Sequence, residues 1–454
     1  MSVLPLEGVR IVDLTAVLMG PYCTAILADL GAEVIRIDPP QGGFGVDLEH
    51  ESPMTGIAVN LHRNKHAVLL DLKTKAGLAA LKRLIRQADG FVTSMRPQAL
   101  QRLGLDHATL AADQPGLISV SAHGFAAGGP YAQRPAYDDI IQAMSGAAAL
   151  QSDYAGHPQY MATDPMDKTC GLFAALGFLA AFLTRQRTGG LGQEVELPMF
   201  EAMTAFLLVE NLYGAAFEPP KGTTVYPRIV ARHRRPYATK DGLIALMVYT
   251  DAHWQRFFSL TGQQSLLEEP RFATLTERTR HIDELYGLMA EIMVEKTTAQ
   301  WLALLEQADI PAAPVLHPQD LLDDPQLTAV GFWSLLSDGT GHKRRYTAFP
   351  VRFSAHPIPV RCQAPQRGAD TLAVLAEAGF SAAEIAELTE QPAQSGEGAA
   401  HPGKKLHAVG DERLGGDDGL GCQQDTLAGT MQGLNEGRGS LGIEARHGLE
   451  VGAG

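Results

Sequence analysis

The strongest constraint on the fold is the alternation of short apolar runs with helical segments at the start of the chain. "GVRIVDLT" at 8–15 and "EVIRID" at 33–38 are typical of buried strands. Between them, residues 20–32 carry apolar side chains at helical spacing, with Pro21 near the first turn and Gly31 at the end. This order of elements predicts a β-α-β unit with two parallel strands.

The same pattern continues along the chain. Further strands are expected at 66–72, 90–95, 117–125 and 193–199, with an amphipathic helix at 75–88. Strands that alternate with helices predict an α/β fold with a Rossmann-like open parallel sheet. Ligands bind such sheets beyond the carboxyl ends of the strands.

A classical dinucleotide site is disfavoured. Asp38 ends the second strand, where dinucleotide-binding folds place an acid that binds ribose. The turn after the first strand, however, reads "TAVLMGPYC" and lacks the GxGxxG glycines. Without them the backbone cannot approach a pyrophosphate closely, so NAD binding is not expected.

The composition along the chain suggests four regions. Residues 1–219 are expected to form a large domain, and 220–330 a smaller α+β domain that contains a hairpin around 241–242. Residues 331–390 form a C-terminal segment with a short helix. The stretch 391–454 is dense in glycine, shows no period and is expected to be disordered, because it buries too little apolar surface.

Charge and hydropathy exclude several classes of partner. The net charge of −14 disfavours nucleic acid, although an anionic ligand could still bind in a local basic pocket. The start of the chain lacks the pattern of a secretory signal. The apolar run 171–183 is shorter than the ~20 residues that cross a bilayer, so no membrane partner is expected.

The cysteines point to a reducing environment. Cys23, Cys170, Cys362 and Cys422 are far apart and form no CxxC or paired-His pattern. Neither a disulfide framework nor a metal site is therefore indicated, and a cytoplasmic location is expected.

One acid stands at an unusual place. In "TDPMDKTCGLFAALGFLAAFL" at 163–183, Asp167 precedes a strongly apolar helix. Local sequence permits a structural acid at the third helical position after an Asp164–Pro165 start, or a reactive carboxylate at the edge of the core. Cys170 is either a small buried side chain or a thiol nucleophile.

Six stretches carry a family resemblance in their order and spacing. They are "LEGVRIVDLT…GPYCTAILADLGAEVIRID", "NKHAVLLDLK", "RPQALQRLGLD", "SAHGFAAGGPYAQRPAYDDIIQAMSG", "MDKTCGLFAALGFLAAFLTRQRTGGLGQEVELPMFEA" and "RRPYATKDG". Together they span about residues 5–390. The chain resembles the family III coenzyme A transferases, which include formyl-CoA:oxalate and carnitine CoA-transferases and are related to the α-methylacyl-CoA racemases.

The resemblance implies a fold and a reaction. It implies an interlocked homodimer, a large CoA-binding domain built from both chain ends, and a smaller domain. Acyl-CoA is then a substrate and no cofactor or metal is bound permanently. The family's reactive aspartate matches Asp167, which would attack the thioester, form a mixed anhydride and then an aspartyl-CoA thioester. Free N–H groups at the start of its helix are expected to stabilise the oxyanions.

Two neighbouring residues bear on the choice of reaction. Tyr137 matches a position where the racemases carry a His, and proton abstraction next to a thioester needs two bases. Tyrosine is a poor base at neutral pH, which favours transfer over racemisation. A protein that binds CoA without turnover stays a further alternative. Asp138 matches a family acid near the reactive carboxylate, and either holds the loop or is a solvated first-turn acid.

The resemblance also implies contacts for CoA. Leu18 and Met19 stand where oxalate-specific members carry a Gln, so a larger or less polar acid than oxalate is expected. The matching CoA positions are Leu70, Asp71, Leu72, Lys73, Ser94, Met95, Arg96, Arg102, Pro135 and Ala136. Asn64 and Lys65 lie on an adjacent loop.

One basic segment has two interpretations. It carries Arg228, Arg232, Arg234 and Arg235 where oxalate-specific members have a run of glycines. These arginines either meet a second carboxylate or the CoA phosphates, or they form a solvated linker.

Overall fold

The computed structural model describes residues 4–40, 54–337 and 341–389. The main strands are β1 (Arg10–Leu14), β2 (Glu33–Asp38), β3 (Lys65–Leu69), β4 (Gly90–Thr93), β5 (Ile118–His123) and β6 (Glu194–Pro198). The others are β7 (Tyr237–Ala238), β8 (Leu243–Leu246), β9 (Ala312–Pro314), β10 (Trp333–Ser337) and β11 (Lys343–Thr347). The predicted tail 391–454 lies outside the described residues.

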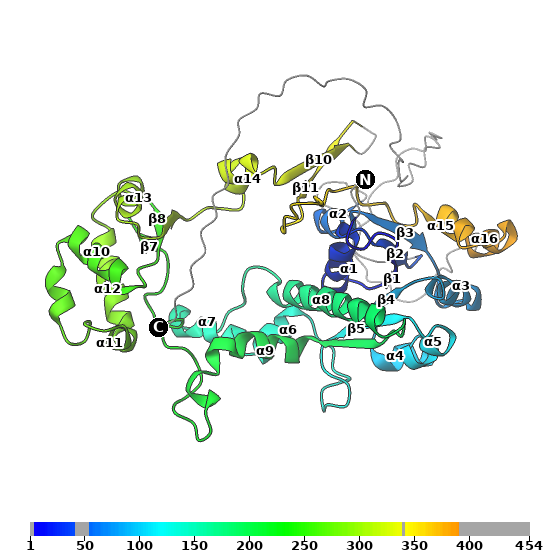
Figure 1. Cartoon of the computed structure of the whole chain (residues 1–454), viewed down its shortest axis with the longest axis horizontal. Coiled ribbons are helices and arrows are strands. Elements are labelled where there is room, and N and C mark those ends of the chain that lie inside the picture. Colours follow the sequence, from blue (N-terminus) through cyan, green and yellow to red (C-terminus); the bar gives the residue numbers. More distant parts are fainter. Residues whose placement is uncertain (1–3, 41–53, 338–340, 390–454) are drawn as a thin grey trace, which may run out of the picture. The chain divides into compact units, whose positions relative to one another are not determined.

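The helices that accompany the large sheet come from both ends of the chain. They are α1 (Met19–Asp29), α2 (Gly56–His62), α3 (Lys75–Ile85), α4 (Pro97–Leu103), α5 (His107–Asp113), α6 (Asp138–Met144), α7 (Ala147–Ala155), α8 (Pro165–Arg187), α9 (Met199–Asn211), α15 (Thr371–Glu377) and α16 (Ala382–Thr389). Figure 1 shows α8 and α9 lying beside each other next to β5.

Six parallel strands form the sheet in the order β3-β2-β1-β4-β5-β6. The order reverses between β1 and β4, which makes this the topological switch point of the sheet. The α/β class and the parallel sheet are as the sequence predicts.

Alternate residues of the strands serve the two faces of the sheet. Ile11 belongs to one hydrophobic cluster with α1 and α8, while its neighbour Val12 belongs to the other with α3 and α15. The second cluster contains Leu375, so the C-terminal segment completes this core. Asp370 reinforces it, because its Oδ2 accepts from Ala67 N of β3 at 2.8 Å.

A separate hydrophobic cluster draws its buried residues from 231–310. Its sheet has the order β7-β8-β9, and β7 and β8 form the expected hairpin. Its helices are α10 (Asp251–Thr261), η2 (Gln264–Glu268), α11 (Leu275–Arg280), α12 (Ile282–Met293) and α13 (Thr298–Gln307). Three short helices flank this region in the sequence: η1 (Tyr213–Ala216) before it, and η3 (Asp320–Asp323) and α14 (Pro325–Ala329) after it.

Several local expectations were wrong. The sequence "YDDIIQAMSGAAAL" at 137–150 predicts a single helix, but the structure has two, because Gly146 adopts φ +94° between α6 and α7. The sequence "FPVRFSAHP" at 349–357 predicts an extended segment, but it joins no sheet, whereas the unpredicted strands β10 and β11 pair just before it. Cys23 and Cys170 are free and buried, but Cys362 is disulfide-bonded, contrary to the expectation of unpaired cysteines.

The apolar run 171–183 is too short to cross a bilayer, but this argument does not hold for the whole helix that contains it. Helix α8 extends over 23 residues and is long and apolar enough to cross a bilayer by length and composition alone. Its side chains at Cys170, Ala174 and Phe178 instead pack in the core with α1. One side of α8 thus belongs to the interior of the large domain.

Candidate functional site

The predicted ligand-binding residues follow the carboxyl ends of the parallel strands. The turn after β1 and the turn after β4 meet at the switch point, where Ala16 N donates to Ser94 Oγ at 3.2 Å. Leu18 is the N-cap residue of α1 and is partly exposed beside buried Met19. Val17, just before it, holds φ +67°, which is strained for a β-branched residue.

The reactive-acid candidate lies in the first turn of α8. Asp164 is the N-cap residue and Pro165 the first helical residue, so Asp167 takes the third position. The Asp164 side chain makes no capping hydrogen bond. The N-cap residue of α8 therefore does not satisfy the free backbone N–H groups in the first turn of the helix, where Asp167 lies.

A residue from another helix supplies the cap. Asp138 is 6% exposed, and its Oδ2 accepts from Met166 N at 2.7 Å and from Asp167 N at 2.9 Å. A carboxylate at a helix N-terminus satisfies the free N–H groups and interacts favourably with the helix dipole. Asp138 is thus neither solvated nor a simple loop anchor: it fixes the start of α8.

This capping corrects the expected oxyanion donors. The N–H groups of Met166 and Asp167 already donate to Asp138, so they are not free to stabilise an oxyanion. The sequence could not show this, because the capping acid lies 28 and 29 residues before its partners.

Gln142 extends the same contact. Its Nε2 donates to Asp138 Oδ1 at 2.6 Å, while its Oε1 accepts from Met161 N at 2.9 Å. Gln142 is 1% exposed, so both of its amide groups need the protein partners that they have. The side chain ties the loop before α8 to α6 and orients the cap. Only its i, i+4 spacing from Asp138 hinted at this role.

The surroundings of Asp167 alter its acidity. Burial raises the pKa of Asp167 to about 7, with further contributions from the charges of Asp138 and Asp164. Both effects disfavour the charged form of a carboxyl group. At neutral pH the group therefore divides between its protonated and ionised forms, as is common for catalytic acids.

Close packing of two helices brings the turn after β1 toward this acid. Gly171 stands one turn after Asp167, and a Cβ there would lie 2.8 Å from Met19 O and 3.0 Å from the ring of Tyr22. Only glycine lets α1 and α8 approach to this distance. Leu18 and Met19 are thereby held on the same side of the sheet as the start of α8.

The turn between β3 and α3 holds the next group of predicted contacts. Leu70 is buried, and Asp71 Oδ1 accepts from Lys73 N at 2.9 Å. Leu72 packs against the core, whereas Lys73 is exposed. The backbone of Asp71 accepts from Thr74, which caps α3.

The two predicted arginines lie on α4. Arg96 is the N-cap residue and Arg102 is in the last turn, and both are exposed. No carboxylate of the described residues pairs with either. Met95, by contrast, packs partly into the core. The two cations are free to meet an anionic ligand.

The loop after β5 leads into Tyr137. Pro135 is exposed, and Ala136 packs so closely on Gly124 that a Cβ at Gly124 would lie 2.5 Å from it. Tyr137 is the N-cap residue of α6 and 66% exposed, with no capping hydrogen bond. Its hydroxyl is accessible to a ligand.

Two residues at the start of β3 have structural roles: Asn64 lies directly before the strand and Lys65 is its first residue. The side chain of Lys65 is fully buried, and its Nζ donates to Asp13 Oδ2 at 3.1 Å, Pro21 O and Thr24 Oγ1. Asn64 is also buried and bridges Asp29 and the backbone of 361–362. Neither is placed to contact CoA phosphates.

The remaining alternatives are answered by contacts and burial. Asp38 is engaged by Arg36 through two hydrogen bonds of 2.8 and 2.7 Å, so it is not free for a ribose. Burial raises the pKa of Cys170 to about 12, which keeps the thiol protonated and argues against a thiolate nucleophile. Among the described residues, no cluster of three His, Cys, Asp or Glu could hold a metal.

The chain is similar to known proteins over most of its length. The family model of CoA-transferase family III matches residues 6–371. The chain is 29% identical to a succinate–glutarate CoA-transferase of Agrobacterium fabrum, over 82% of this chain and 95% of the relative. It is 31% identical to an acetyl-CoA:oxalate CoA-transferase of Acetobacter aceti, over 72% of this chain and 84% of the relative.

A solved structure has the same fold. A CaiB/BaiF family protein from Brucella suis superposes with a TM-score of 0.69 at 27% identity, covering 83% of this chain and 100% of that one.

Proposed function

The chain belongs to CoA-transferase family III, and we propose that this acyl-CoA:carboxylate CoA-transferase works through a covalent intermediate on Asp167. The observation that carries the proposal is the position of this acid. Asp167 is half-buried in the first turn of an apolar helix, and its pKa is raised to about 7. The N-terminus of this helix is capped by Asp138, so the Asp167 carboxyl group does not serve as the cap.

The proposed reaction has four steps. The Asp167 carboxylate attacks the thioester carbonyl and expels CoA thiolate, which leaves a mixed anhydride. The thiolate attacks the aspartyl carbonyl, releasing the donor acid and leaving an aspartyl-CoA thioester. The acceptor carboxylate attacks that thioester and expels thiolate again, and the thiolate attacks the acceptor's carbonyl in the second anhydride. The product is a new acyl-CoA with the carboxylate of Asp167 restored.

The neighbouring residues have separate roles in this proposal. Asp138 positions α8 and raises the basicity of Asp167, which makes the carboxylate a better nucleophile. Tyr137 donates a hydrogen bond from its hydroxyl to the carbonyl oxygen of the thioester or anhydride. Its exposure and its place directly before Asp138 support this role.

CoA is proposed to bind along the carboxyl edge of the sheet. The turn 70–73 offers backbone groups and apolar side chains for the adenine ring. Arg96 and Arg102 are exposed and free of acidic partners within the described ranges, which suits them to the phosphates.

The acceptor is proposed to be a carboxylic acid larger than oxalate. The partly exposed Leu18 follows β1 and offers no polar group that could bind a second carboxylate at that place. The succinate–glutarate relative, by its name, acts on longer diacids. A dicarboxylic acid of this kind fits both observations.

A homodimer is part of the proposal. The outer sides of α8 and α9 expose large apolar residues, as interaction surfaces do. These residues are Leu172, Phe173, Leu176 and Leu183 on α8, and Phe206 and Val209 on α9. Sedimentation equilibrium measures the expected dimer, and a stable monomer at micromolar concentration would contradict it.

The test of the mechanism compares two acids of the same helix turn. D167A is expected to lower transfer by on the order of 10⁴-fold, because the nucleophile is lost. D164N is the matched control, since Asp164 is exposed and makes no capping bond, and it should retain most of the activity. Full activity of D167A would refute the mechanism.

Trapping identifies the covalent species. Hydroxylamine added during turnover is expected to leave a hydroxamate on Asp167, read by mass spectrometry of the peptide. An adduct on Cys170 would overturn the assignment. Deuterium from solvent at the α-carbon, without any acceptor acid, would instead select the racemase alternative.

A further inference from the structure

A fully buried ion pair lies beneath the turn that joins β1 to α1. The side chains of Asp13 and Lys65 are both 0% exposed, and Lys65 Nζ lies 3.1 Å from Asp13 Oδ2. The same ammonium group donates to Pro21 O at 2.9 Å and to Thr24 Oγ1 at 2.7 Å. All three N–H groups of the lysine therefore have acceptors, and two of these acceptors lie in the first two turns of α1.

Asp13 holds the other end of the same turn. Its Oδ1 accepts from Thr15 N at 3.1 Å and from Thr15 Oγ1. Thr15 in turn packs against Gly20, where a Cβ would lie only 2.4 Å from Thr15 Cβ. The buried pair therefore fixes the chain on both sides of residues 16–20: at Thr15 through Asp13, and at Pro21 through Lys65.

The turn between these two anchors is strained. Val17 has φ +67°, a left-handed conformation that β-branched residues rarely adopt. Such a conformation persists only where surrounding contacts enforce it, and without them its population falls by on the order of 10- to 100-fold. Ala16 N makes one such contact, to Ser94 Oγ at 3.2 Å. The buried pair makes two more, at Thr15 and Pro21.

The strained turn lies close to the helix of the reactive acid. A Cβ at Gly171 would lie 2.8 Å from Met19 O, so the backbone of the turn touches α8 there. Gly171 follows Asp167 by four residues, a rise of about 6 Å along the helix. Met19 is therefore within about one helical turn of Asp167. Leu18, directly before it, is the partly exposed residue of this turn.

The buried pair is better suited to fix geometry than to add stability. Taking two charges out of water costs about as much free energy as their attraction returns, so apolar side chains of similar volume are often equally stable. The hydrogen bonds of Asp13 and Lys65 are directional, however, and apolar side chains could not replace them at Thr15 and Pro21.

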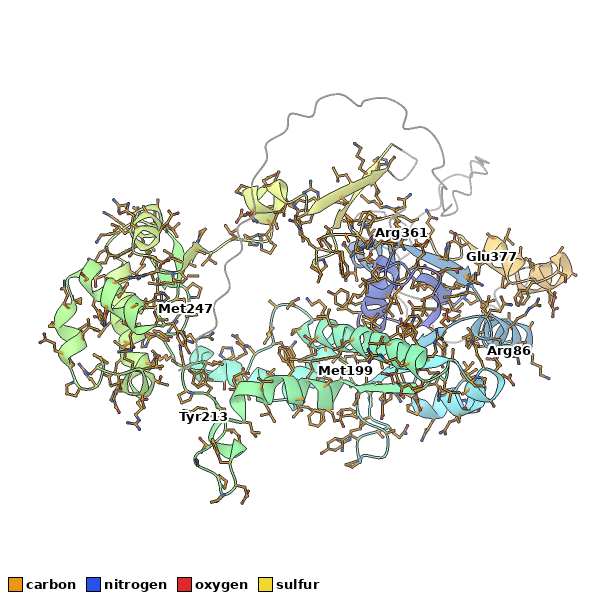
Figure 2. All side chains as sticks on the ribbon, in the orientation of Figure 1. Arg86, Met199, Tyr213, Met247, Arg361 and Glu377 are labelled. Atoms are coloured by element: carbon orange, nitrogen blue, oxygen red, sulfur yellow. The ribbon has the colours of Figure 1, made fainter. Side chains whose placement is uncertain are left out.

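A second buried ion pair provides a comparison at the opposite end of α1. Arg63 Nη2 lies 2.7 Å from Asp29 Oδ2, and Asp29 is the last residue of the helix. Arg361, labelled in Figure 2, holds the same end, because its Nη2 donates to Ala28 O at 2.8 Å. Arg63 stands two residues before Lys65, so one short segment anchors both ends of α1, and only Lys65 reaches the strained turn.

We propose that the buried pair of Asp13 and Lys65 positions Leu18 for the selection of the acceptor acid. Lys65 is then a positioning residue: it keeps Val17 in its left-handed conformation and thereby fixes where the Leu18 side chain lies. The proposal rests on the proposed function, because that function assigns Leu18 to the fit of the acceptor.

The test removes the charges and keeps the shape of the two side chains. In D13L/K65M, leucine has the branched shape of aspartate, and methionine fills most of the place of lysine. Its unfolding midpoint in urea is expected to stay close to that of wild type, because an apolar pair replaces a buried ion pair. The second variant, D13N/K65M, keeps an oxygen that accepts from Thr15 N. It should lie between D13L/K65M and wild type in the two measurements below.

The kinetic measurement compares glutarate with oxalate as acceptors. The ratio of their kcat/KM values does not depend on the fraction of folded enzyme, so a merely structural role would leave it unchanged. In D13L/K65M the ratio in favour of glutarate is expected to fall about tenfold, the scale of one misplaced apolar contact. D29N/R63M, at the other end of α1, is the control and should keep the ratio within about twofold. An unchanged ratio in D13L/K65M would overturn the proposal.

Hydrogen–deuterium exchange tests the turn without turnover. Mass spectrometry of peptides across 15–22 is expected to show exchange about tenfold or more faster in D13L/K65M, and unchanged exchange in D29N/R63M. Wild-type exchange rates in D13L/K65M would overturn the proposal even if transfer through Asp167 is established. If wild type transfers CoA to no acid, the proposed function fails, and the exchange alone then decides whether the buried pair positions Leu18.

Discussion

The N-terminal cap of α8 can be tested by exchanging the functional groups of its two side chains, the carboxylate of Asp138 and the amide of Gln142. D138N keeps one oxygen to accept from Met166 N and Asp167 N. Its new NH₂ group then faces the NH₂ of Gln142, whose Nε2 lies 2.6 Å from Asp138 Oδ1. Two buried donors would oppose each other, and we expect D138N to lose about 1–3 kcal/mol of stability.

The reverse change has a different cost. Q142E would place a second carboxylate oxygen against Asp138 Oδ1 in a site where both residues are nearly inaccessible. Two like charges there are expected to cost about 3 kcal/mol or more, or to be relieved by uptake of a proton.

The double variant D138N/Q142E restores the hydrogen bond between the two side chains with donor and acceptor exchanged. The amide of residue 138 caps α8 and donates to the new carboxylate at 142, which still accepts from Met161 N. We expect a coupling free energy of about 2 kcal/mol in favour of the double variant. Urea unfolding of the two single variants, the double variant and the parent measures it.

The same variants separate two effects of Asp138: its capping of α8, which stability measures, and the effect of its charge on the pKa of Asp167, which the pH dependence of kcat/KM measures. Removal of the Asp138 charge is expected to lower the pKa of Asp167, because a nearby like charge disfavours the ionised form of its carboxyl group. The acid limb of kcat/KM should therefore move to lower pH in D138N. If the two single destabilisations simply add in the double variant, the proposed cap is wrong.

Three further outcomes follow. Because the reactive form of Asp167 is the ionised one and its pKa is raised to about 7, kcat/KM should fall about tenfold per pH unit below about 7. The raised pKa also means that wild type loses stability as the buried carboxyl group ionises. D167N should therefore gain stability relative to wild type as pH rises from about 4 to 8, which unfolding curves in buffers across that range measure. G171A should push α1 away from α8, because the new Cβ would lie 2.8 Å from Met19 O. The variant is expected to lose about 1–3 kcal/mol of stability in urea unfolding and to have lower activity. G56A is the control and should change neither, because a Cβ at Gly56 would meet nothing within 4 Å. K65M should cost about 3–5 kcal/mol in the same assay, because it leaves Asp13 buried without its cation, and an unchanged unfolding midpoint would contradict the buried pair.

The alternation of apolar runs was sufficient to predict the parallel sheet. Each strand of the large sheet overlaps its predicted range, because buried parallel strands are nearly continuous apolar runs and the helices between them are amphipathic. The break between α6 and α7 was not predicted, because the turn signal of Ser145–Gly146 is a single glycine that helices also tolerate, and the flanking residues are good helix formers. The hairpin β10–β11 was missed as well, because its residues "KRRYT" carry few apolar side chains.

Lys65 shows why residue type alone does not define a site. A lysine beside a loop near the sheet is a reasonable phosphate ligand in sequence. In the fold its side chain points into the core and binds Asp13 and Thr24. Its burial depends on residues 41 and 52 positions away in the chain, which no local pattern records.

By itself, the sequence determined the α/β class, the family and the position of the acid at the start of an apolar helix. These properties depend on local periodicity and on the order of motifs. The tertiary structure decided that Asp138 and Gln142 cap that helix, that Gly171 brings α1 against it, and that Arg228 donates to the hydroxyl of Tyr286. The physical reason is that burial, pKa and hydrogen-bond partners are set by side chains that are distant in sequence and become neighbours only when the chain folds.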